Sequence, residues 1–120
     1  MLLHGLIDDF LAKGDRGGDA DYIEVTPTDS DLGLVTNTPH VVLEIDSADY
    51  QQAASVLSSR QVIEAYGTLQ SSQTFINASG GVDTIPVVQV LRLDKCGDNT
   101  FFCPAGTPTQ TIFTTTAASF

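Results

Sequence analysis

The N-terminal residues carry an apolar stripe at helical spacing. In segment 2–13, apolar side chains recur three and four positions apart, at Leu3, Leu6, Ile7, Phe10 and Leu11. This spacing is typical of one face of an amphipathic helix, and a glycine such as Gly14 is common directly after a helix ends. The pattern therefore predicts an N-terminal amphipathic helix over residues 1–14. A polar, glycine-rich linker over residues 15–21 is expected to follow it.

From residue 22 onward the pattern changes to the alternation of strands. Alternating or continuous apolar runs separated by turn residues predict strands at 22–26, 32–36, 40–46, 61–70, 74–78, 84–93, 100–103 and 110–116. Gly67 interrupts one of these runs and indicates a bulge or bend. The segment 47–59 instead has helical spacing behind Ser47, a favourable N-cap residue, and predicts one short middle helix.

These elements predict an α+β, mostly β chain that forms a single domain over residues 1–120. Residues 22–103 are expected to form its β-rich core, and residues 104–120 a C-terminal extended arm. The run 62–93 contains a strand with a central glycine, a polar loop, the turn Ser79-Gly80-Gly81 and an apolar strand. It resembles the closing strands of an OB-type barrel. The set of elements predicts a small curled antiparallel sheet, and the resemblance implies an OB-like barrel.

The charge of the chain narrows the classes of partner. Five basic residues against fifteen acidic ones give a formal charge of −10 at pH 7. Such a chain repels phosphate, so direct nucleic-acid contact and binding to an anionic membrane surface are both unexpected. The basic and aromatic groove of OB-type nucleic-acid binders is also missing from the sequence. No apolar stretch approaches the roughly 18 residues of a membrane span, and the acidic pair Asp8-Asp9 near the start is untypical of a secretion signal.

No catalytic motif is evident, and the chain is expected not to be an enzyme. His4 and His40 stand near no nucleophile elbow or catalytic cysteine, and no phosphate-binding glycine loop is present. Carboxylates occur in pairs, but a glycosidase cleft usually has aromatic platforms as well, and the chain lacks tryptophan. We therefore expect no cofactor.

Calcium is the alternative considered for the glycine-rich linker. Asp15, Asp19 and Asp21 are hard oxygen ligands on a flexible loop, as calcium prefers. Their spacing departs from that of an EF-hand, and Arg16 adds a positive charge between them. A solvated linker is the favoured interpretation, with a calcium site as the less favoured one.

The two cysteines, Cys96 and Cys103, leave two alternatives open. Six residues separate them, which suits a disulfide clip in an oxidising compartment and equally two free thiols near a turn. Zinc is disfavoured because two further ligands at the usual spacing are missing.

The ends of the chain carry the functional hypothesis. Residues Leu3, Ile7 and Phe10 on the expected helix, with Ile112 and Phe113 in the neutral, threonine-rich arm, are predicted to form a protein interface. This predicts a non-catalytic assembly subunit, a homo-oligomer or part of a larger complex. The plan of a helix, an extended region, a strand, a helix and a long hairpin is similar to that of tail-terminator-like virion proteins. A phage capsid, connector or tail component is therefore expected, in a virion or extracellular location, with a cytoplasmic one left open.

Two alternatives to the assembly subunit are kept. One is an OB-like binding module for a peptide, a sugar or a small ligand on the open face of the sheet. The other is a secreted, disulfide-clipped domain stabilised by calcium.

Overall fold

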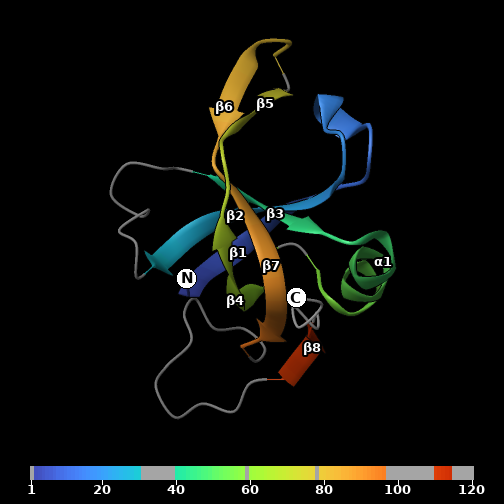
Figure 1. Cartoon of the computed structure of the whole chain (residues 1–120), viewed down its shortest axis with the longest axis vertical. Helices are drawn as coiled ribbons and strands as arrows, with labels where there is room; N and C mark the ends of the chain where they lie inside the picture. The colour runs from blue at the N-terminus through green and yellow to red at the C-terminus, as the bar shows by residue number, and fades with distance from the viewer. Residues whose placement is uncertain (1, 31–39, 59, 78, 97–109, 115–120) are drawn as a thin grey trace.

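The computed structural model describes residues 2–30, 40–58, 60–77, 79–96 and 110–114, which form a curled sheet with a projecting hairpin (Figure 1). Within these residues the elements are β1 (Leu2–Leu11), the 3₁₀ turn η1 (Asp15–Gly17), β2 (Asp21–Ser30), β3 (Val41–Ile45), α1 (Ser47–Val56), β4 (Val62–Leu69), β5 (Gln73–Ile76), β6 (Val82–Ile85), β7 (Val87–Lys95) and β8 (Gln110–Thr114). The predicted mostly β fold with a short middle helix and a curled, largely antiparallel sheet is confirmed. The strands predicted at 32–36 and 100–103 lie outside the described residues.

The main sheet closes on itself. Its strands lie in the order β3-β2-β1-β4-β7-β8, and β3 pairs additionally with β7. All pairs in this sheet are antiparallel except β3 with β7, which are parallel. Residues 87–89 of β7 pair with β3, and residues 92–95 of the same strand pair with β8. The ring β1–β2–β3–β7–β4 is therefore complete, and β8 extends it along the second half of β7.

The predicted N-terminal helix is wrong, because these residues form β1. Leu3 and Ile7 are four positions apart, an even spacing, and both side chains enter the core. A bulge between Ile7 and Asp9 adds one residue, so the next side chain against the core is Phe10. Strand alternation with one bulge thus gives the same spacing as a helical stripe. Hydrogen-bonded pairing with β2 on one side and β4 on the other favours the strand.

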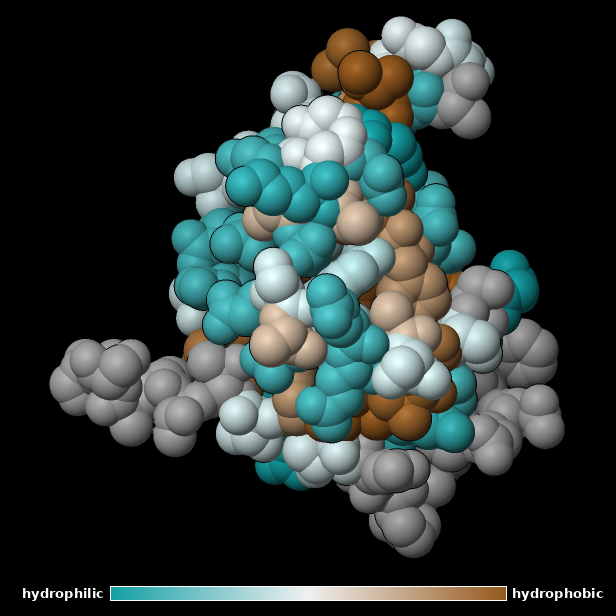
Figure 2. Space-filling model, turned by 90° about the vertical axis from the view of Figure 1, so that its right-hand side faces the viewer, coloured by the Kyte–Doolittle hydropathy of each residue, from teal (hydrophilic) through white to brown (hydrophobic). Residues whose placement is uncertain are grey.

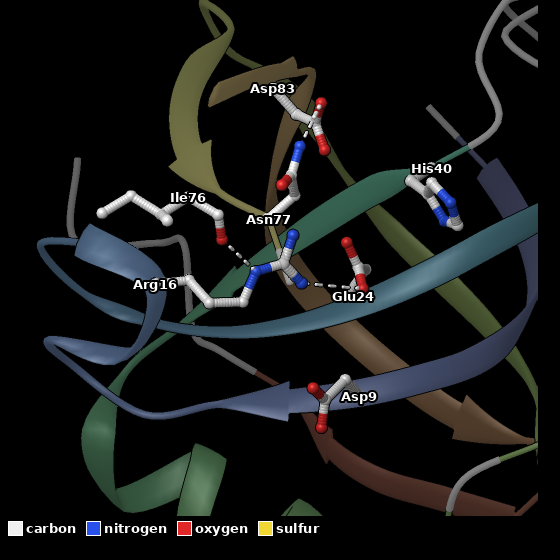
Figure 3. A pocket seen from close by; sticks show the side chains of 7 residues that line it. All are labelled: Asp9, Arg16, Glu24, His40, Ile76, Asn77 and Asp83. Carbon is white, nitrogen blue, oxygen red and sulfur yellow. Dashed lines mark hydrogen bonds and ion pairs between the residues drawn. The ribbon is translucent and has the colours of Figure 1, made fainter. Parts of the chain in front are cut away.

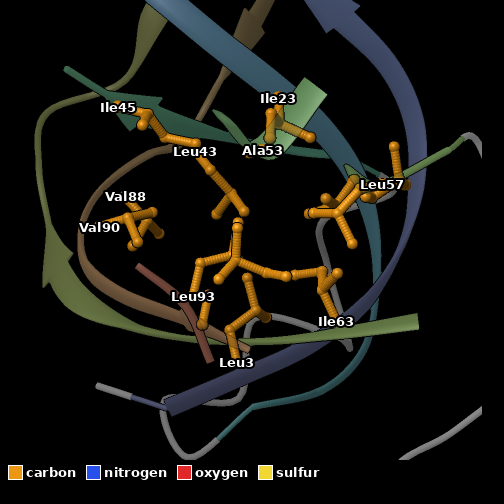
Figure 4. Packing of buried hydrophobic residues seen from close by; sticks show 14 of the residues in the cluster. Leu3, Ile23, Leu43, Ile45, Ala53, Leu57, Ile63, Val88, Val90 and Leu93 are labelled. Carbon is orange, nitrogen blue, oxygen red and sulfur yellow. The ribbon is translucent and has the colours of Figure 1, made fainter. Parts of the chain in front are cut away.

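The interior of the ring holds the larger of two apolar clusters, which we call the inner core (Figure 4). Its buried members are Leu3, Ile7, Ile23, Val25, Val41, Leu43, Ile45, Ala53, Leu57, Ile63, Ala65, Val88, Val90, Leu93, Ile112 and Phe113. Every strand of the main sheet contributes, α1 adds Ala53, and Leu57 follows directly after the helix. Burial of this surface is the main stabilisation of the fold.

Helix α1 matches the predicted middle helix but ends at Val56 rather than at residue 59. The N-cap is Asp46, while the Ser47 hydroxyl donates to Asp21 Oδ2 at 2.8 Å. Gln52 Nε2 donates to the carbonyl of Ile112 at 2.9 Å, which joins the helix to β8. The helix thereby links β8 to the start of β2.

A second apolar cluster, the outer cluster, lies on the outside of the ring. It contains Leu11, Tyr22, Val42, Phe75, Ile85 and Val87, which are all buried. The hairpin β5–β6 forms a separate two-stranded sheet and supplies Phe75 and Ile85. In β3, Val41, Leu43 and Ile45 belong to the inner core and Val42 to the outer cluster. Both faces of β3 are therefore covered, which explains its nearly continuous apolar sequence.

The bulge predicted at Gly67 is confirmed. The register of β4 against β7 shifts between Tyr66 and Gly67. A Cβ at Gly67 would collide with the carbonyl oxygen of Gln89 on β7. Glycine is thus required for the close approach of the two backbones at the point where the sheet curls.

The C-terminal strand pairs with its own chain. Of the predicted arm 104–120, the structure describes 110–114, which form β8 antiparallel to β7. Ile112 and Phe113 are 5% and 7% exposed and join the inner core. This part of the arm thus packs within the chain, and the rest of it lies outside the described residues.

Candidate functional site

A cleft of about 420 Å³ opens on the outer face of β1 and β2, between the β1–β2 connection and the β5–β6 hairpin (Figure 3). Its lining residues are Asp9, Arg16, Glu24, His40, Ile76, Asn77 and Asp83. Six of these seven side chains are polar or charged. The cleft therefore continues the outer cluster with a polar surface on the same side of the sheet.

The β1–β2 connection places Arg16 over the cleft. Gly14 and Gly17 have positive φ values of 93° and 82°, and Arg16 between them has a φ of 53° in the left-handed region. Such a conformation is unfavourable for a non-glycine residue and is held by its surroundings. The Asp15 and Asp21 carboxylates hold the loop by accepting from the backbone N–H groups of Ala12 at 3.0 Å and Lys13 at 2.8 Å.

Arg16 bridges the two sides of the cleft (Figure 3). Its Nε donates to the carbonyl of Ile76 on the hairpin at 2.8 Å, and its Nη1 donates to Glu24 Oε1 on β2 at 3.1 Å. The Glu24 side chain is only 9% exposed, so its charge requires a partner of opposite charge. One guanidinium thus neutralises a buried carboxylate and fixes the hairpin to the connection.

A second set of contacts anchors the hairpin beside the cleft. The rings of Tyr22 and Phe75 meet edge to face, with centroids 5.2 Å apart. Tyr22 Oη lies 2.7 Å from Asp19 Oδ1 and 2.7 Å from Gln73 Oε1, and Gln73 Nε2 donates to Asp19 at 3.2 Å. A Cβ at Gly18 would lie 2.9 Å from the Tyr22 ring, so this packing needs glycine there.

This network shifts two ionisation equilibria. Burial, reinforced by the hydrogen bond to Asp19 and by its charge, raises the pKa of the Tyr22 phenol well above its ordinary value. Hydrogen bonds from Tyr22 and Gln73 lower the pKa of the Asp19 carboxyl. The folded chain thus favours a neutral phenol next to an ionised carboxylate, the arrangement that holds the hairpin in place.

The tip of the hairpin is shaped by Asn77. Its Oδ1 accepts from the backbone N–H groups of Ser79 at 3.0 Å and Gly81 at 2.9 Å, and its Nδ2 donates to Asp83 Oδ1 at 3.3 Å. Ile76 and Val82 are paired across the hairpin and are 49% and 67% exposed. Figure 2 shows this exposed apolar surface at the top of the molecule, where the hairpin projects. An apolar lip therefore borders the polar cleft.

One end of the cleft brings together three potential metal ligands. The ligand atoms of Asp8, Glu24 and His40 all lie within 4.8 Å of one another. His40 Nδ1 is 3.1 Å from Asp8 Oδ2, and the hydroxyl of Thr26 donates to the same oxygen at 2.7 Å. These residues come from β1, β2 and the position just before β3, so the strand order creates the group. Imidazole with two carboxylates can bind a proton, a positively charged ligand group or a divalent metal ion.

Most of the predicted interface residues face the interior of their own chain. Leu3 and Ile7 are fully buried, and Ile112 and Phe113 nearly so. Phe10 is partly buried against the inner core, with its ring 6.5 Å from that of Tyr50. The interface assigned to these five residues stays a prediction, but the apolar stripe on which it was based serves the core.

The three aspartates considered for calcium are not brought together. Asp15 accepts from the N–H of Ala12, Asp19 binds Tyr22 and Gln73, and Asp21 accepts from Lys13 and Ser47. Among the described residues, the one group of three or more residues with closely spaced metal-ligand atoms is Asp8, Glu24 and His40.

Cys96 lies at the end of β7 and is fully buried, and it is not a free thiol. Cys103 lies outside the described residues. The Cys96–Cys103 bridge therefore stays a prediction.

Sequence reasoning did not identify the cleft. It treated Asp8-Asp9, the acidic segment around Arg16, and His40 separately. A signal was present, because Glu24 interrupts the apolar run of β2 between Ile23 and Val25, and His40 stands directly before the apolar strand β3. Their convergence depends on pairing between β1, β2 and β3, which no local pattern specifies.

Comparison with protein-family models, with curated proteins and with solved structures gives no match for this chain. Among the described helices, none combines the length and the apolar character that crossing a bilayer requires.

Proposed function

We propose that the chain is an OB-like barrel that works as a non-catalytic binding module, with its ligand in the cleft between the β1–β2 connection and the β5–β6 hairpin. Support comes from the closed ring β1–β2–β3–β7–β4, with a helix between β3 and β4 and a projecting connection between β4 and β7. OB-type barrels bind ligands on this face and between the corresponding loops. The single observation that carries the proposal is that the polar cleft lies between the β1–β2 connection and the β5–β6 hairpin.

The charges of the cleft favour a ligand with a positively charged group. Asp9, Glu24 and Asp83 supply three carboxylates against the one guanidinium of Arg16, an excess of two negative charges without counting His40. The whole chain adds to this potential with a formal charge of −10. Arg16 also shows the type of group that the cleft holds, because it is bound by a carboxylate and a backbone carbonyl.

The apolar lip adds a second element of recognition. Ile76 lines the cleft and lies opposite the exposed Val82. A peptide with a basic side chain next to an apolar one would place its charge among the carboxylates and its apolar group on the lip. We therefore propose a basic peptide segment or a small apolar amine as ligand, rather than a sugar or an acidic metabolite.

The assembly function expected from the chain ends has less support, because four of its five contact residues are buried in their own chain. A virion component and a virion or extracellular location both stay predictions.

Titration of the ¹⁵N-labelled full-length protein with arginine amide and with the peptide Leu-Arg-amide, in buffer containing EDTA, tests the proposal. We expect backbone shifts at Asp9, Arg16, Glu24 and Ile76 with an affinity that falls as salt is added, since salt screens charge pairs in an open cleft. The peptide should bind more tightly than arginine amide because of its leucine. Leucinamide with a blocked amine is the neutral control.

The variant pair Asp9→Asn/Asp83→Asn is expected to reduce binding about tenfold or more, since two of the carboxylates that attract the cation are lost. The pair Asp46→Asn/Asp49→Asn, at the N-cap and in the first turn of α1, removes the same charge away from the cleft and should change the affinity little. Equal losses in both pairs would mean that net charge alone attracts the probe. Together with shifts spread over the whole surface, this result would contradict the proposed site.

A further inference from the structure

We propose that Asp8, Glu24 and His40 form a site for a divalent metal ion of the zinc class at one end of the cleft. The proposal rests on the proposed function in one respect. Both assume that the acidic cleft binds a positively charged ligand, and the ligand here is an inorganic cation. It concerns different side chains from Asp9 and Asp83, which the peptide test addresses.

The mixture of ligands selects the class of ion. Calcium and magnesium take oxygen ligands almost alone, whereas imidazole suits zinc, cobalt and other first-row divalent ions. One imidazole and two carboxylates supply three protein ligands, and the open cleft leaves room for water or a ligand group as the fourth. The carboxylates of Asp8 and Glu24 carry two negative charges, of which Arg16 offsets one, so the ligand group keeps a net attraction for a divalent cation.

The geometry requires little rearrangement. A tetrahedral ion with ligand distances of about 2.0–2.1 Å sets its ligand atoms about 3.3 Å apart. Asp8 Oδ2 and His40 Nδ1 are already 3.1 Å apart, and the complete group spans no more than 4.8 Å. The His40 side chain is 46% exposed, so its ring can rotate without disturbing the core. Glu24 is held by β2 and by Arg16, and it supplies the fixed side of the site.

Two neighbouring groups support the ligands. Thr26 donates its hydroxyl proton to Asp8 Oδ2 and so orients that carboxylate. Arg16 Nη1 holds Glu24 Oε1 and leaves the second oxygen of the carboxylate for the ion. Such outer hydrogen bonds orient metal ligands and strengthen binding. Binding of the ion through His40 Nδ1 requires that nitrogen to be unprotonated, and any proton on it would pass to solvent.

The same barrel contains a matched control. His4 Nε2 lies 2.9 Å from Glu64 Oε1, a contact of a histidine with a carboxylate between β1 and β4. This pair belongs to no group of three ligand residues among the described part of the chain. If histidine and carboxylate alone were sufficient, both places would bind metal equally well. The proposal requires a third ligand and therefore predicts that zinc binds at His40 and not at His4.

The test is calorimetric titration of the chelator-treated full-length protein with Zn²⁺, together with visible absorption after addition of Co²⁺. We expect one equivalent to bind with a cobalt spectrum of low coordination number. His40→Gln and Asp8→Asn should each weaken binding by more than about a hundredfold, and Thr26→Val, which removes only an outer hydrogen bond, by about tenfold. His4→Gln and Glu64→Gln should leave the affinity unchanged. Thermal unfolding of each apo variant checks that its fold persists.

Two results would overturn the inference. One is absence of a zinc-binding event at micromolar protein concentration, and the other is binding that survives both His40→Gln and Asp8→Asn. The outcome is separable from that of the peptide test, which is done in EDTA. If the Asp9→Asn/Asp83→Asn variant loses peptide binding as expected but the unmodified protein binds no zinc, the metal site alone is contradicted. Zinc binding without any peptide binding would contradict the peptide ligand alone.

Discussion

The inner core and the outer cluster are both buried and largely apolar, yet they are enclosed in different ways. The inner core is surrounded by a ring of strands in which each strand is paired on both sides. The outer cluster is covered by the β5–β6 hairpin, whose two strands pair with each other and form a separate sheet. Opening the first requires the ring to break, whereas opening the second requires only that the hairpin moves away.

This difference assigns separate tasks to the two regions. The inner core maintains the fold, and the outer cluster positions one wall of the cleft. Elements held by few contacts open at lower free energy than the rest of a protein, and binding regions often belong to this class. The contacts of Arg16 with Ile76 and of Tyr22 with Asp19 and Gln73 then limit how far the hairpin moves.

The largest effect is expected from a matched pair of leucine truncations. Leu43 is fully buried in the inner core and Leu11 is 2% exposed in the outer cluster. Leu43→Ala should lower the free energy of unfolding by about 2–5 kcal/mol, because the ring cannot collapse onto the cavity. Leu11→Ala should cost clearly less, since the hairpin can settle into the space. Chemical denaturation measures both values, and equal losses would show that the two clusters unfold as one unit.

A smaller and more local effect is expected in the hairpin itself. Phe75→Ala removes the ring that packs on Tyr22 and should lower global stability by about 1–2 kcal/mol, less than Leu43→Ala. Its main result should be faster hydrogen exchange of β5 and β6 amides, with the ring strands little changed. Val82→Ala on the same hairpin is the control, because that side chain is 67% exposed. Uniformly faster exchange throughout the chain would contradict the proposed independence of the hairpin.

The same contrast explains what the sequence could predict. Most strands, the middle helix and the bulge at Gly67 depend on local alternation, capping and the glycine requirement, so pattern reading found them. The N-terminal segment was misread because the bulge between Ile7 and Asp9 changes the spacing of inward side chains from two to three. Ring closure through β3 and β7 joins segments more than forty residues apart. The gathering of Asp8, Glu24 and His40 follows from strand order, which local patterns do not contain.

The smallest effect tests how the hairpin responds to pH. The pKa of Tyr22 is higher in the folded chain than its ordinary value of 10.0, so the stability that the neutral phenol contributes is complete below that pH and is lost as the pH rises beyond it. The pKa of Asp19 is lowered, so its contribution is complete above its ordinary value and is lost as the pH falls through the folded one. Tyr22→Phe should therefore flatten both the alkaline and the acid limb of a stability profile. The alkaline slope should decrease by no more than about 1.4 kcal/mol per pH unit, the value for one proton.

Burial also raises the pKa of Tyr66, so Tyr66→Phe is the control. It should reduce the alkaline slope but leave the part of the acid limb that comes from Asp19, because the carboxylate hydrogen-bonded to Tyr66 is that of Glu64. Hairpin amides should therefore respond to Tyr22→Phe and not to Tyr66→Phe.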